Sequence, residues 1–556
     1  MRKLFTSVAL SLALGITSSA YCFDFSPTQT PSKKETVKSG KVQISPVLLS
    51  ALAKMKLATN IEMVSFSDDG MRLSSIRGKL STPISGDLEN GAKSYLIDNS
   101  VIFNLPSKKS SDLKTIETEE MNGLNSVTFE MYFDKYPVRD AQIQVNIGKD
   151  KTVQLVNGSF PTVNEITNSI AISQEEAISA AKKAIGTADQ RSEISSKLVV
   201  FPKEDGSAVM AYQMMIPSEK PLGDFEVLVN AENGEVLWQL NQMAFENATL
   251  ASPTVTGLGS VFVNHPLVAS ATNVPLHHLT TKTLEGLYAK VVNEDTAGSI
   301  SETYEHVYDP DNTHFDESNI YFYITNVHDF FKNLGYNKLD KPLKAVVHYG
   351  TKYDNAYFSP QTNSMAFGDG NKLNDLAKEE SVCYHEYSHA HVQQIVVLNY
   401  SKESGAINEG QADYFGCSLS NDPILGEYAV QKMGKPWLRN LTDNLHYPED
   451  IQGEVHADGR IWGVVLWDLR LALGAEKSDK IIEQSFYSLK AGSPKFIDGY
   501  NAILVADKTL FNSENTPVIT QVFQKRGIAP ASYNGTVLTG KDLDVIGKFN
   551  AVHAEN

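Results

Sequence analysis

The chain has 556 residues, which is enough for about three or four domains of ordinary size. Hydrophobic residues make up 42% and charged residues 21% of the chain, a balance that is typical of soluble folded domains and excludes a largely disordered protein. The formal net charge of -17 argues against nucleic acid or an anionic membrane as a partner, because acidic surfaces repel phosphate groups.

Residues 1–20 have the pattern of a secretory signal peptide. Arg2 and Lys3 precede an apolar stretch at 4–16, and the small residues Ser18 and Ala20 follow it. The apolar stretch is too short to span a bilayer comfortably, and no later stretch is apolar enough to do so. We therefore expect a secreted protein without a membrane anchor.

Residues 42–240 mostly show the alternation of polar and apolar side chains that is typical of strands. A polar linker is predicted at 28–41, and strands at 127–133, 141–147, 153–156, 208–216 and 225–240. A capping box from Ser173 to Glu176 opens a helix predicted at 175–185, while Asn157-Gly158 and Asn233-Gly234 are turn signals. The pattern predicts an antiparallel sheet with one or two packed helices, and it contains no catalytic constellation.

After about residue 250 the pattern becomes mainly helical. Strands are predicted at 259–263 and 344–348, and helices at 319–334, 381–400, 407–419, 460–473, 480–489 and 499–510. Three cysteines, at positions 22, 383 and 417, are too few for a disulfide framework. Cys383 and Cys417 could form one disulfide or remain two buried thiols, and the sequence does not distinguish these alternatives.

The segment His385-Glu-Tyr-Ser-His389 is the strongest chemical signal in the chain. On a helix, residues four positions apart lie on one face, so both imidazoles can bind one zinc ion. Glu386 would lie beside the metal and act as general base. The pattern alone is moderately specific, and an ordinary surface helix with two histidines is the competing interpretation.

Glu409 favours the zinc interpretation, because two histidines and one glutamate form an established catalytic zinc set. It lies 20 residues after His389, and a second helix returning past the first could bring it to the metal. Asp413 follows one turn later on the same face and could bind a ligand histidine; the alternative is a plain surface carboxylate.

Residues 355–416 resemble the catalytic core of the thermolysin-like metallopeptidases, with features also close to the fungalysins. The resemblance rests on Asn355-Ala-Tyr-Phe358, Ala366-Phe-Gly-Asp-Gly370, the zinc motif and its ungapped spacing to Glu409. It implies that Asn355 and Ala356 belong to an edge strand that pairs with the substrate backbone. It also implies that Tyr400 stabilises the transition state and that Asn408 and Asp413 bind the two ligand histidines.

Further residues extend this resemblance toward the C-terminus. Glu454-Val-His-Ala-Asp-Gly-Arg-Ile-Trp462 resembles the segment that carries the catalytic histidine, which implies this role for His456. Leu438 and Val382 match walls of the pocket for the residue after the scissile bond, and Arg439 matches an arginine that binds a substrate carbonyl. His446 is the competing candidate for the catalytic histidine, but it lacks the matching context. His391 lies two residues beyond His389, which turns it off the zinc face, and we interpret both as surface histidines.

The N-terminal half resembles the pro-region of the same enzymes. Residues 129–158 look like the fungalysin and thermolysin propeptide, and residues 173–240 like the inhibitory module that follows it. The resemblance implies an α+β fold with a cystatin-like pro-region and a two-lobed thermolysin-like catalytic domain. The expected divisions are a signal peptide at 1–20, a propeptide at 21–165, an inhibitory module at 166–245, and catalytic lobes at 250–400 and 401–556.

Two departures from the family pattern matter. Ser381 and Ser420 stand where thermolysin has acidic ligands of its paired calcium site, so we do not expect structural calcium. The aspartate that orients the catalytic histidine has no ungapped match, and Asp450 is the nearest candidate for it.

The resemblance implies a zinc endopeptidase made as a zymogen, with protein or peptide substrates and its own pro-region as inhibitor and chaperone. In this mechanism Glu386 takes a proton from the attacking water, and Tyr400 and His456 stabilise the oxyanion. The apolar pocket predicts cleavage before hydrophobic residues. A zinc aminopeptidase or a catalytically silent binding protein are the alternatives; the spacing to Glu409 and the intact ligand set argue against them.

Overall fold

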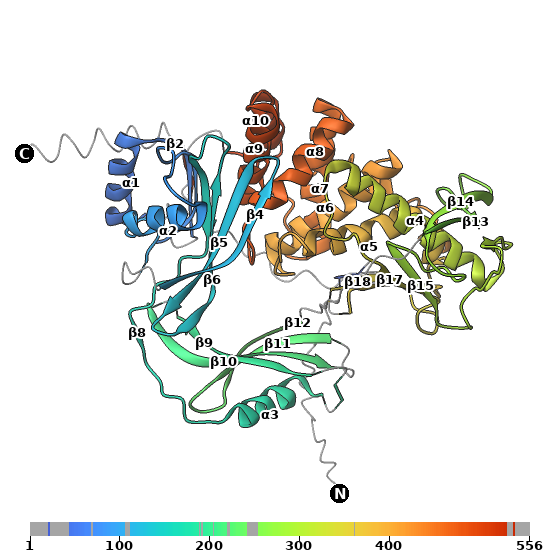
Figure 1. The fold of residues 1–556 in the computed structure, drawn as a ribbon, viewed down its shortest axis with the longest axis horizontal. Helices are drawn as coiled ribbons and strands as arrows, with labels where there is room; N and C mark the ends of the chain where they lie inside the picture. Colours follow the sequence, from blue (N-terminus) through green and yellow to red (C-terminus); the bar gives the residue numbers. More distant parts are fainter. Residues whose placement is uncertain are drawn as a thin grey trace, which may run out of the picture.

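The computed structural model describes residues 21–22, 44–67, 71–105, 112–187, 189–190, 193–203, 205–218, 223–241, 254–360, 362–530 and 537–539. The predicted signal peptide and the predicted linker lie outside these residues. The fold is mixed α+β, with a β-rich N-terminal half and a helical C-terminal part (Figure 1).

The N-terminal half, which the sequence predicts to be a pro-region, is built on one long and mainly antiparallel sheet. Its main path runs β12-β11-β10-β9-β6-β7-β3-β2, with β4 paired on β5 and β8 paired on β10. The strands are β2 (Asn60–Phe66), β3 (Leu73–Lys79), β4 (Leu113–Met121), β5 (Leu124–Phe133), β6 (Tyr136–Ile147), β7 (Val153–Gly158), β8 (Glu165–Ile166), β9 (Ser195–Pro202), β10 (Ser207–Ser218), β11 (Gly223–Asn230) and β12 (Val236–Asn241). A strand from the far end of the chain, β22 (Val537–Thr539), pairs with β2 and extends the sheet.

Three helices pack in this half: α1 (Pro46–Ala58), α2 (Leu88–Asp98) and α3 (Gln174–Ile185). The predicted capping box is confirmed, because the Glu176 amide donates to Ser173 Oγ and the Glu176 carboxylate accepts from the Ser173 amide. The predicted hairpin at Asn233-Gly234 is also confirmed, since it joins β11 to β12.

The turn predicted at Asn157-Gly158 is wrong. Both residues belong to β7, where Gly158 pairs with Ile143 in extended backbone. The corresponding signal at Asn122-Gly123 does form a turn between β4 and β5, with φ of 55° and 85°. Both central residues of a tight hairpin turn need positive φ, which asparagine and glycine tolerate best.

The catalytic region begins with a β-rich lobe, at the right of Figure 1. Its strands are β13 (Val255–Val261), β14 (Thr272–Leu279), β15 (Ala289–Asn293), β16 (Glu305–His306), β17 (Leu343–Val347), β18 (Ala356–Ser359) and β19 (Ser364–Phe367), and the long helix α4 (Thr313–Leu334) packs against them. The short strand β1 (Tyr21–Cys22) pairs antiparallel with β18 at the edge of this lobe's sheet.

The second lobe is helical and is joined to the first by α5 (Glu380–Gln393). Its helices are α6 (Lys402–Ser420), α7 (Val455–Leu473), α8 (Ala475–Ser485), α9 (Phe496–Phe511) and α10 (Thr516–Lys525), with a short 3₁₀ turn η4 (Phe486–Ser488) after α8. The helix predicted at 381–400 was too long, because α5 ends at Gln393. The following run Ile395-Val-Val397 is β-branched and disfavours continued helix.

The two halves of the chain have separate hydrophobic cores. One core lies within the pro-region between Ile44 and Ala231. The other fills the catalytic region from Leu276 to Ala529 and, among the described pro-region residues, includes the buried Met63 and contacts the partly buried Met121. Cys383 and Cys417 are buried free thiols in the catalytic core, which decides between the two alternatives left open above. None of the helices in the described ranges is both long and apolar enough to cross a membrane.

Candidate active site

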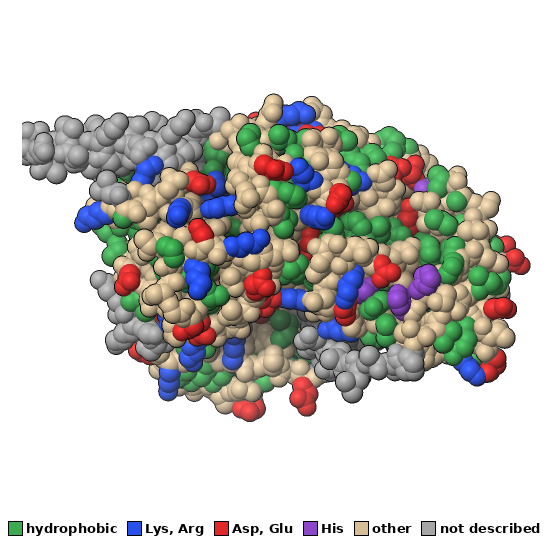
Figure 2. Space-filling model, turned by 45° about the horizontal axis from the view of Figure 1, so that its top comes forward, with side chains coloured by type: hydrophobic (Ala, Val, Ile, Leu, Met, Phe, Trp, Pro, Cys, Tyr) green, Lys and Arg blue, Asp and Glu red, His purple; other side chains and the backbone are tan. Residues whose placement is uncertain are grey.

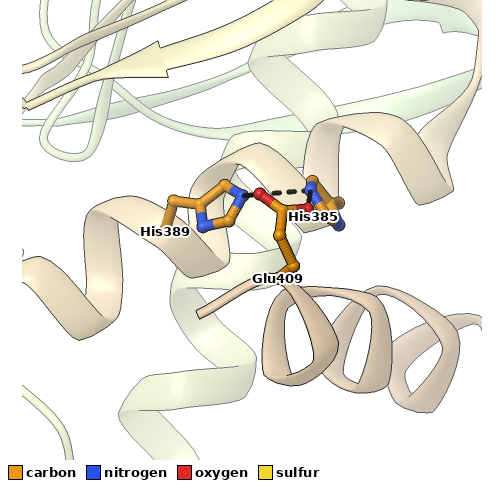
Figure 3. A group of neighbouring side chains, drawn as sticks. All are labelled: His385, His389 and Glu409. Atoms are coloured by element: carbon orange, nitrogen blue, oxygen red, sulfur yellow. Dashed lines mark hydrogen bonds and ion pairs between the residues drawn. The ribbon is translucent and has the colours of Figure 1, made fainter. Parts of the chain in front are cut away.

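Two helices bring His385, His389 and Glu409 together. The histidines lie one turn apart on α5, with their Nε2 atoms 3.0 Å from each other. Glu409 on α6 directs its carboxylate toward both rings, 3.5 Å from His385 Nε2 and 3.4 Å from His389 Nε2 (Figure 3). All three side chains are buried. This is the geometry that the sequence motif predicted.

The outer ring nitrogens of both histidines are held by side chains of α6. His385 Nδ1 lies 2.9 Å from Asp413 Oδ1, and His389 Nδ1 lies 2.9 Å from Asn408 Oδ1. These contacts fix each ring so that both Nε2 atoms point to a common centre. Both partners were predicted from the sequence.

The donor set fits zinc. Two imidazole nitrogens and one carboxylate oxygen are typical ligands of catalytic zinc, with a fourth position left for water. Glu409 Oε2 is buried and has no hydrogen-bond partner among the described residues, which is costly unless a cation compensates it. His385, His389 and Glu409 are therefore the residues that would hold the metal.

Arg439 lies behind this centre and binds Asp413. Its Nη2 donates to Asp413 Oδ1 over 2.7 Å and is 3.5 Å from His385 Nδ1. Burial alone would raise the pKa of Asp413, but Arg439 and His385 hold it below its usual value. Asp413 therefore stays charged and can orient His385.

The ionisable groups of the centre differ in their proton affinity. Burial raises the pKa of Glu386 to about 8, although His385 opposes this rise. Burial would lower the pKa of His385, but Asp413 and Glu409 raise it to about 9, whereas burial lowers the pKa of His389 to about 4. Both oxygens of Glu386 are buried without a hydrogen-bond partner among the described residues. Such a carboxylate is suited to proton transfer near neutral pH.

Tyr400 and His456 lie together beside Glu409. The Tyr400 hydroxyl donates to Glu409 Oε1 over 2.5 Å and lies 3.1 Å from His456 Nε2. The two helices that carry Glu409 and His456 approach closely at glycines, because a Cβ on Gly410 would lie 2.2 Å from the carbonyl oxygen of Gly459. The close approach of α6 and α7 therefore brings His456 to the metal centre.

The carboxylate that contacts His456 Nδ1 belongs to Glu454, so the prediction that Asp450 orients this histidine is wrong. Glu454 Oε1 lies 2.7 Å from His456 Nδ1, and Glu454 also caps α7 by accepting from the amides of His456 and Ala457. Asp450 binds the His446 amide instead. A carboxylate directly before a helix start is an N-cap signal, which could have indicated Glu454.

The predicted substrate-binding residues lie around the metal centre and differ in how far their side chains are exposed to solvent. Asn355 directly precedes β18, where Ala356 is the first residue, and its Oδ1 accepts from the Ala356 amide. Val382 is completely buried on α5, and Leu438 is half-buried and packs against the same core. Arg439 is 7% exposed.

His391 was expected at the surface, and this interpretation is wrong. The residue is completely buried, and its Nε2 lies 2.6 Å from Glu483 Oε2 on α8. Nothing in the local sequence indicates this contact, because the two residues are 92 positions apart.

A second group of possible metal ligands, Asp295, His348 and Asp369, differs from the first. His348 Nδ1 lies 2.8 Å from Asp369 Oδ1, and His348 Nε2 lies 2.9 Å from the carbonyl oxygen of Thr313. Burial alone would lower the pKa of His348, but these bonds and the nearby Asp316 raise it to about 9. A protonated imidazole bound on both sides needs no metal ion to satisfy it.

Three family models match the chain. The model described as thermolysin metallopeptidase, catalytic domain, matches residues 269–393, and the fungalysin metallopeptidase model matches residues 340–531. The fungalysin/thermolysin propeptide motif matches residues 113–160, which include β4 to β7. The chain is a thermolysin-like metallopeptidase precursor. It is thus a zinc metalloendopeptidase with its own pro-region, as the sequence resemblance implied.

Named relatives agree with this family. Bacillolysin of Bacillus subtilis is 25% identical over 481 residues, which cover 80% of this chain and 90% of the relative. A zinc metalloproteinase of Listeria monocytogenes is 23% identical and covers 74% of this chain and 87% of its own length. An extracellular elastase of Staphylococcus epidermidis is also 23% identical, with 76% and 88% covered.

Among solved structures, the precursor of protealysin, a metalloproteinase from Serratia proteamaculans, is 21% identical to this thermolysin-like precursor. It covers 45% of this chain and 91% of its own, with a TM-score of 0.38.

Proposed function

We propose that this thermolysin-like precursor is a secreted zymogen that, once processed, cleaves peptide bonds on the amino side of hydrophobic residues. The observation that carries the proposal is the convergence of His385, His389 and Glu409 beside Glu386, with Tyr400 and His456 on the same side. The N-terminal residues 1–20 support secretion, and one relative is named an extracellular elastase.

The residues of the centre have separate roles in the proposed reaction. Bound zinc supplies Lewis-acid polarisation of the scissile carbonyl and activation of a water molecule. Glu386 accepts the proton of the attacking water and later gives it to the leaving amine. Tyr400 and His456 donate hydrogen bonds to the developing oxyanion, and Glu454 orients His456.

Substrate selection rests on β18 and on the apolar residues beside the zinc helix. Asn355 and Ala356 would pair with the substrate backbone, while Val382 and Leu438 would line the pocket for the residue after the scissile bond. Arg439 would bind a substrate carbonyl in addition to holding Asp413. The complete burial of Val382 and Glu386 in the precursor fits a cleft that is closed before processing.

Inhibition by the pro-region is supported at the substrate-binding strand. Tyr21 and Cys22 pair antiparallel with Phe358 and Tyr357, so the chain's own backbone occupies the edge of β18. A peptide substrate would need that edge. We place a propeptide at 21–165, an inhibitory module at 166–245 and the lobes at 250–400 and 401–556. We expect cleavage of the pro-region near residues 240–255, most of which lie outside the described residues.

Zinc is the only metal in this proposal. At the position where thermolysin has a calcium ligand, Ser381 Oγ donates to Glu379 Oε1 and accepts from the Gly426 amide. Ser420 Oγ donates to the carbonyl oxygen of Gly416. Each hydroxyl thus has a protein partner, which supports a scaffold without the paired calcium site of thermolysin.

The variant Glu386→Gln tests the proposal, because it removes the base and keeps the zinc ligands. We expect kcat/KM for a labelled peptide to fall about 10²–10⁴-fold, with an unchanged zinc content per chain. If processing is autocatalytic, the variant also accumulates as full precursor.

Two controls complete this test. A peptide with a blocked N-terminus must still be cleaved by the native enzyme, which distinguishes an endopeptidase from an aminopeptidase. A zinc-loaded, processed native protein that cleaves no peptide would refute the proposed function.

A further inference from the structure

A buried pair of hydrogen-bonded polar side chains lies behind the zinc helix, on the side away from the metal centre. His391 on α5 binds Glu483 on α8, and the two side chains are 0% and 1% exposed. The imidazole also stacks on Phe331 of α4 with a ring distance of 3.7 Å. The pair therefore exists only when α4, α5 and α8 are together.

Each member of the pair depends on the other. His391 Nδ1 and Glu483 Oε1 are buried and have no hydrogen-bond partner among the described residues. An imidazole or carboxylate that enters the core alone is strongly destabilising, because nothing replaces its lost hydration. Contacts across 92 residues also form slowly, because a long loop must close first. If the segments next to His391 and Glu483 were ordered first, the slow closure of this long loop would no longer limit the formation of the pair.

The hairpin of β4 and β5 in the pro-region contacts the segments around this pair. Asn122 Nδ2 donates to Gln484 Oε1 over 2.7 Å, and Gln484 directly follows Glu483. Lys338, just after α4, forms an ion pair with Glu119 of the hairpin and donates to the carbonyl oxygen of Gln394 at the end of α5. The hairpin thus reaches the ends of all three helices that build the pair.

The turn of the hairpin also packs on the end of α4. A Cβ on Gly335, the residue that ends α4, would lie 3.4 Å from the terminal methyl carbon of Met121. Met121 packs against the catalytic core. Tyr336, the residue directly after Gly335, contacts the His391 ring edge-on at 4.0 Å. Apolar contact therefore accompanies the polar contacts of Asn122 and Glu119.

Neighbouring strands of the pro-region satisfy the carbonyl groups that follow α8. The carbonyl oxygen of Tyr487 accepts from Ser126 and Gln144, and that of Ser488 accepts from Asn157 over 2.7 Å. Carbonyls at a helix end have no partner within their own helix and need one from elsewhere. In Figure 1 the hairpin and these strands lie beside α8 and α9, on the helical lobe.

We propose that the β4–β5 hairpin is a folding template for the back of the zinc helix: it positions Lys338 and Gln484 while His391 and Glu483 meet, and it is dispensable afterwards. This inference rests on the proposed zymogen, because it assigns the chaperone role of the pro-region to one hairpin. The proposal predicts that Asn122 and Gln484 affect the rate of folding and not the rate of peptide-bond hydrolysis.

The test is a double-mutant cycle on refolding of the full precursor. Asn122→Gly keeps the left-handed turn and removes the amide, while Gln484→Ala removes its partner. Each protein is unfolded in guanidinium and diluted into buffer with zinc. Recovery is followed by the fluorescence of the buried Trp462 and Trp467 and by bound zinc per chain.

We expect each single variant to refold about fivefold more slowly, and the double variant to refold no more slowly than either single variant. The unfolding rate of the folded precursor should change less than about twofold, as expected for a contact already made in the transition state. The exposed Thr118→Ala on β4 is the matched control and should refold like the native protein.

Native refolding rates in both single variants, or fully additive effects in the double variant, would overturn the inference. If Asn122→Gly does not refold at all, Glu119→Gln takes its place in the test. This variant keeps a neutral hydrogen bond to Lys338, so its refolding must be slowed by a smaller factor while its unfolding rate stays nearly unchanged. Neither readout needs peptidase activity. A protein that refolds in this hairpin-dependent way but cleaves no peptide would therefore refute the proposed function alone.

Discussion

At the scale of single residues, polar side chains of the helix α6 hold the two ligand histidines of the metal centre in place. Asp413 joins one of these histidines to Arg439, because its Oδ1 contacts both His385 Nδ1 and Arg439 Nη2. Its charge keeps the His385 ring in place and offsets the charge of the buried guanidinium. Glu454 has the corresponding role for His456.

Replacing Asp413 by asparagine should weaken zinc binding about 10- to 100-fold, because the amide keeps the shape and loses the charge. Competition with a chromophoric chelator measures this affinity directly. The exposed Glu476→Gln on α8, whose carboxylate contacts Lys480, is the control. An unchanged zinc affinity in Asp413→Asn would show that the contact does not orient His385.

At the scale of elements, His348 forms hydrogen bonds that connect three segments of the first lobe. It directly follows β17, and it binds Thr313 at the start of α4 and Asp369 shortly after β19. The raised pKa of about 9 means that the folded protein holds this proton more tightly than the unfolded chain, whose value is near 6.5. The link therefore contributes stability that is complete below about pH 6.5 and is lost as the pH rises through about 9.

The variant His348→Gln should lose this pH dependence. Between pH 6.5 and 9 the Tm of the native precursor should fall relative to that of the variant, so that the difference between them becomes smaller. Thermal unfolding in a pH series measures the effect. His277→Gln, at an exposed position, should follow the native protein across the series. A constant Tm difference across the series would contradict the ion-pair interpretation.

At the scale of the whole molecule, two separate cores meet through a contact that is largely polar. Across it, Leu124 and Leu155 pack on Val505, while hydroxyl and amide side chains of the pro-region bind carbonyls after α8. On the face drawn in Figure 2, acidic and basic side chains are interspersed and are not separated by sign. The family resemblance places Ser381 and Ser420 where thermolysin has calcium ligands, and both hydroxyls form hydrogen bonds within the chain.

Removal of calcium should therefore leave the molecule intact, whereas removal of zinc should not. We expect EGTA to leave the Tm of the precursor and the activity of the processed enzyme unchanged. Phenanthroline should abolish activity and lower the Tm, and added zinc should restore both, because bound metal stabilises the folded state. A marked fall in Tm with EGTA would disprove the calcium-free scaffold.

The sequence by itself determined the parts of this protein that depend on local geometry or on a fixed spacing. The helical period places His385 and His389 on one face, and a returning helix at the observed spacing could bring Glu409 and Asp413 to them. The resemblance to thermolysin-like enzymes implied the same residues and added Asn408. Strand alternation and the capping box at Ser173 likewise predicted elements of the pro-region, because they report on neighbouring residues.

Only the tertiary structure decided the contacts between distant segments. It pairs His391 with Glu483, leaves Cys383 and Cys417 as free thiols, and places the hairpin of β4 and β5 against α8 and the end of α4. It also placed Asn157-Gly158 inside the strand β7, paired with β6. Such contacts depend on how packed helices and sheets approach each other, and residue patterns within one element contain no information about that approach.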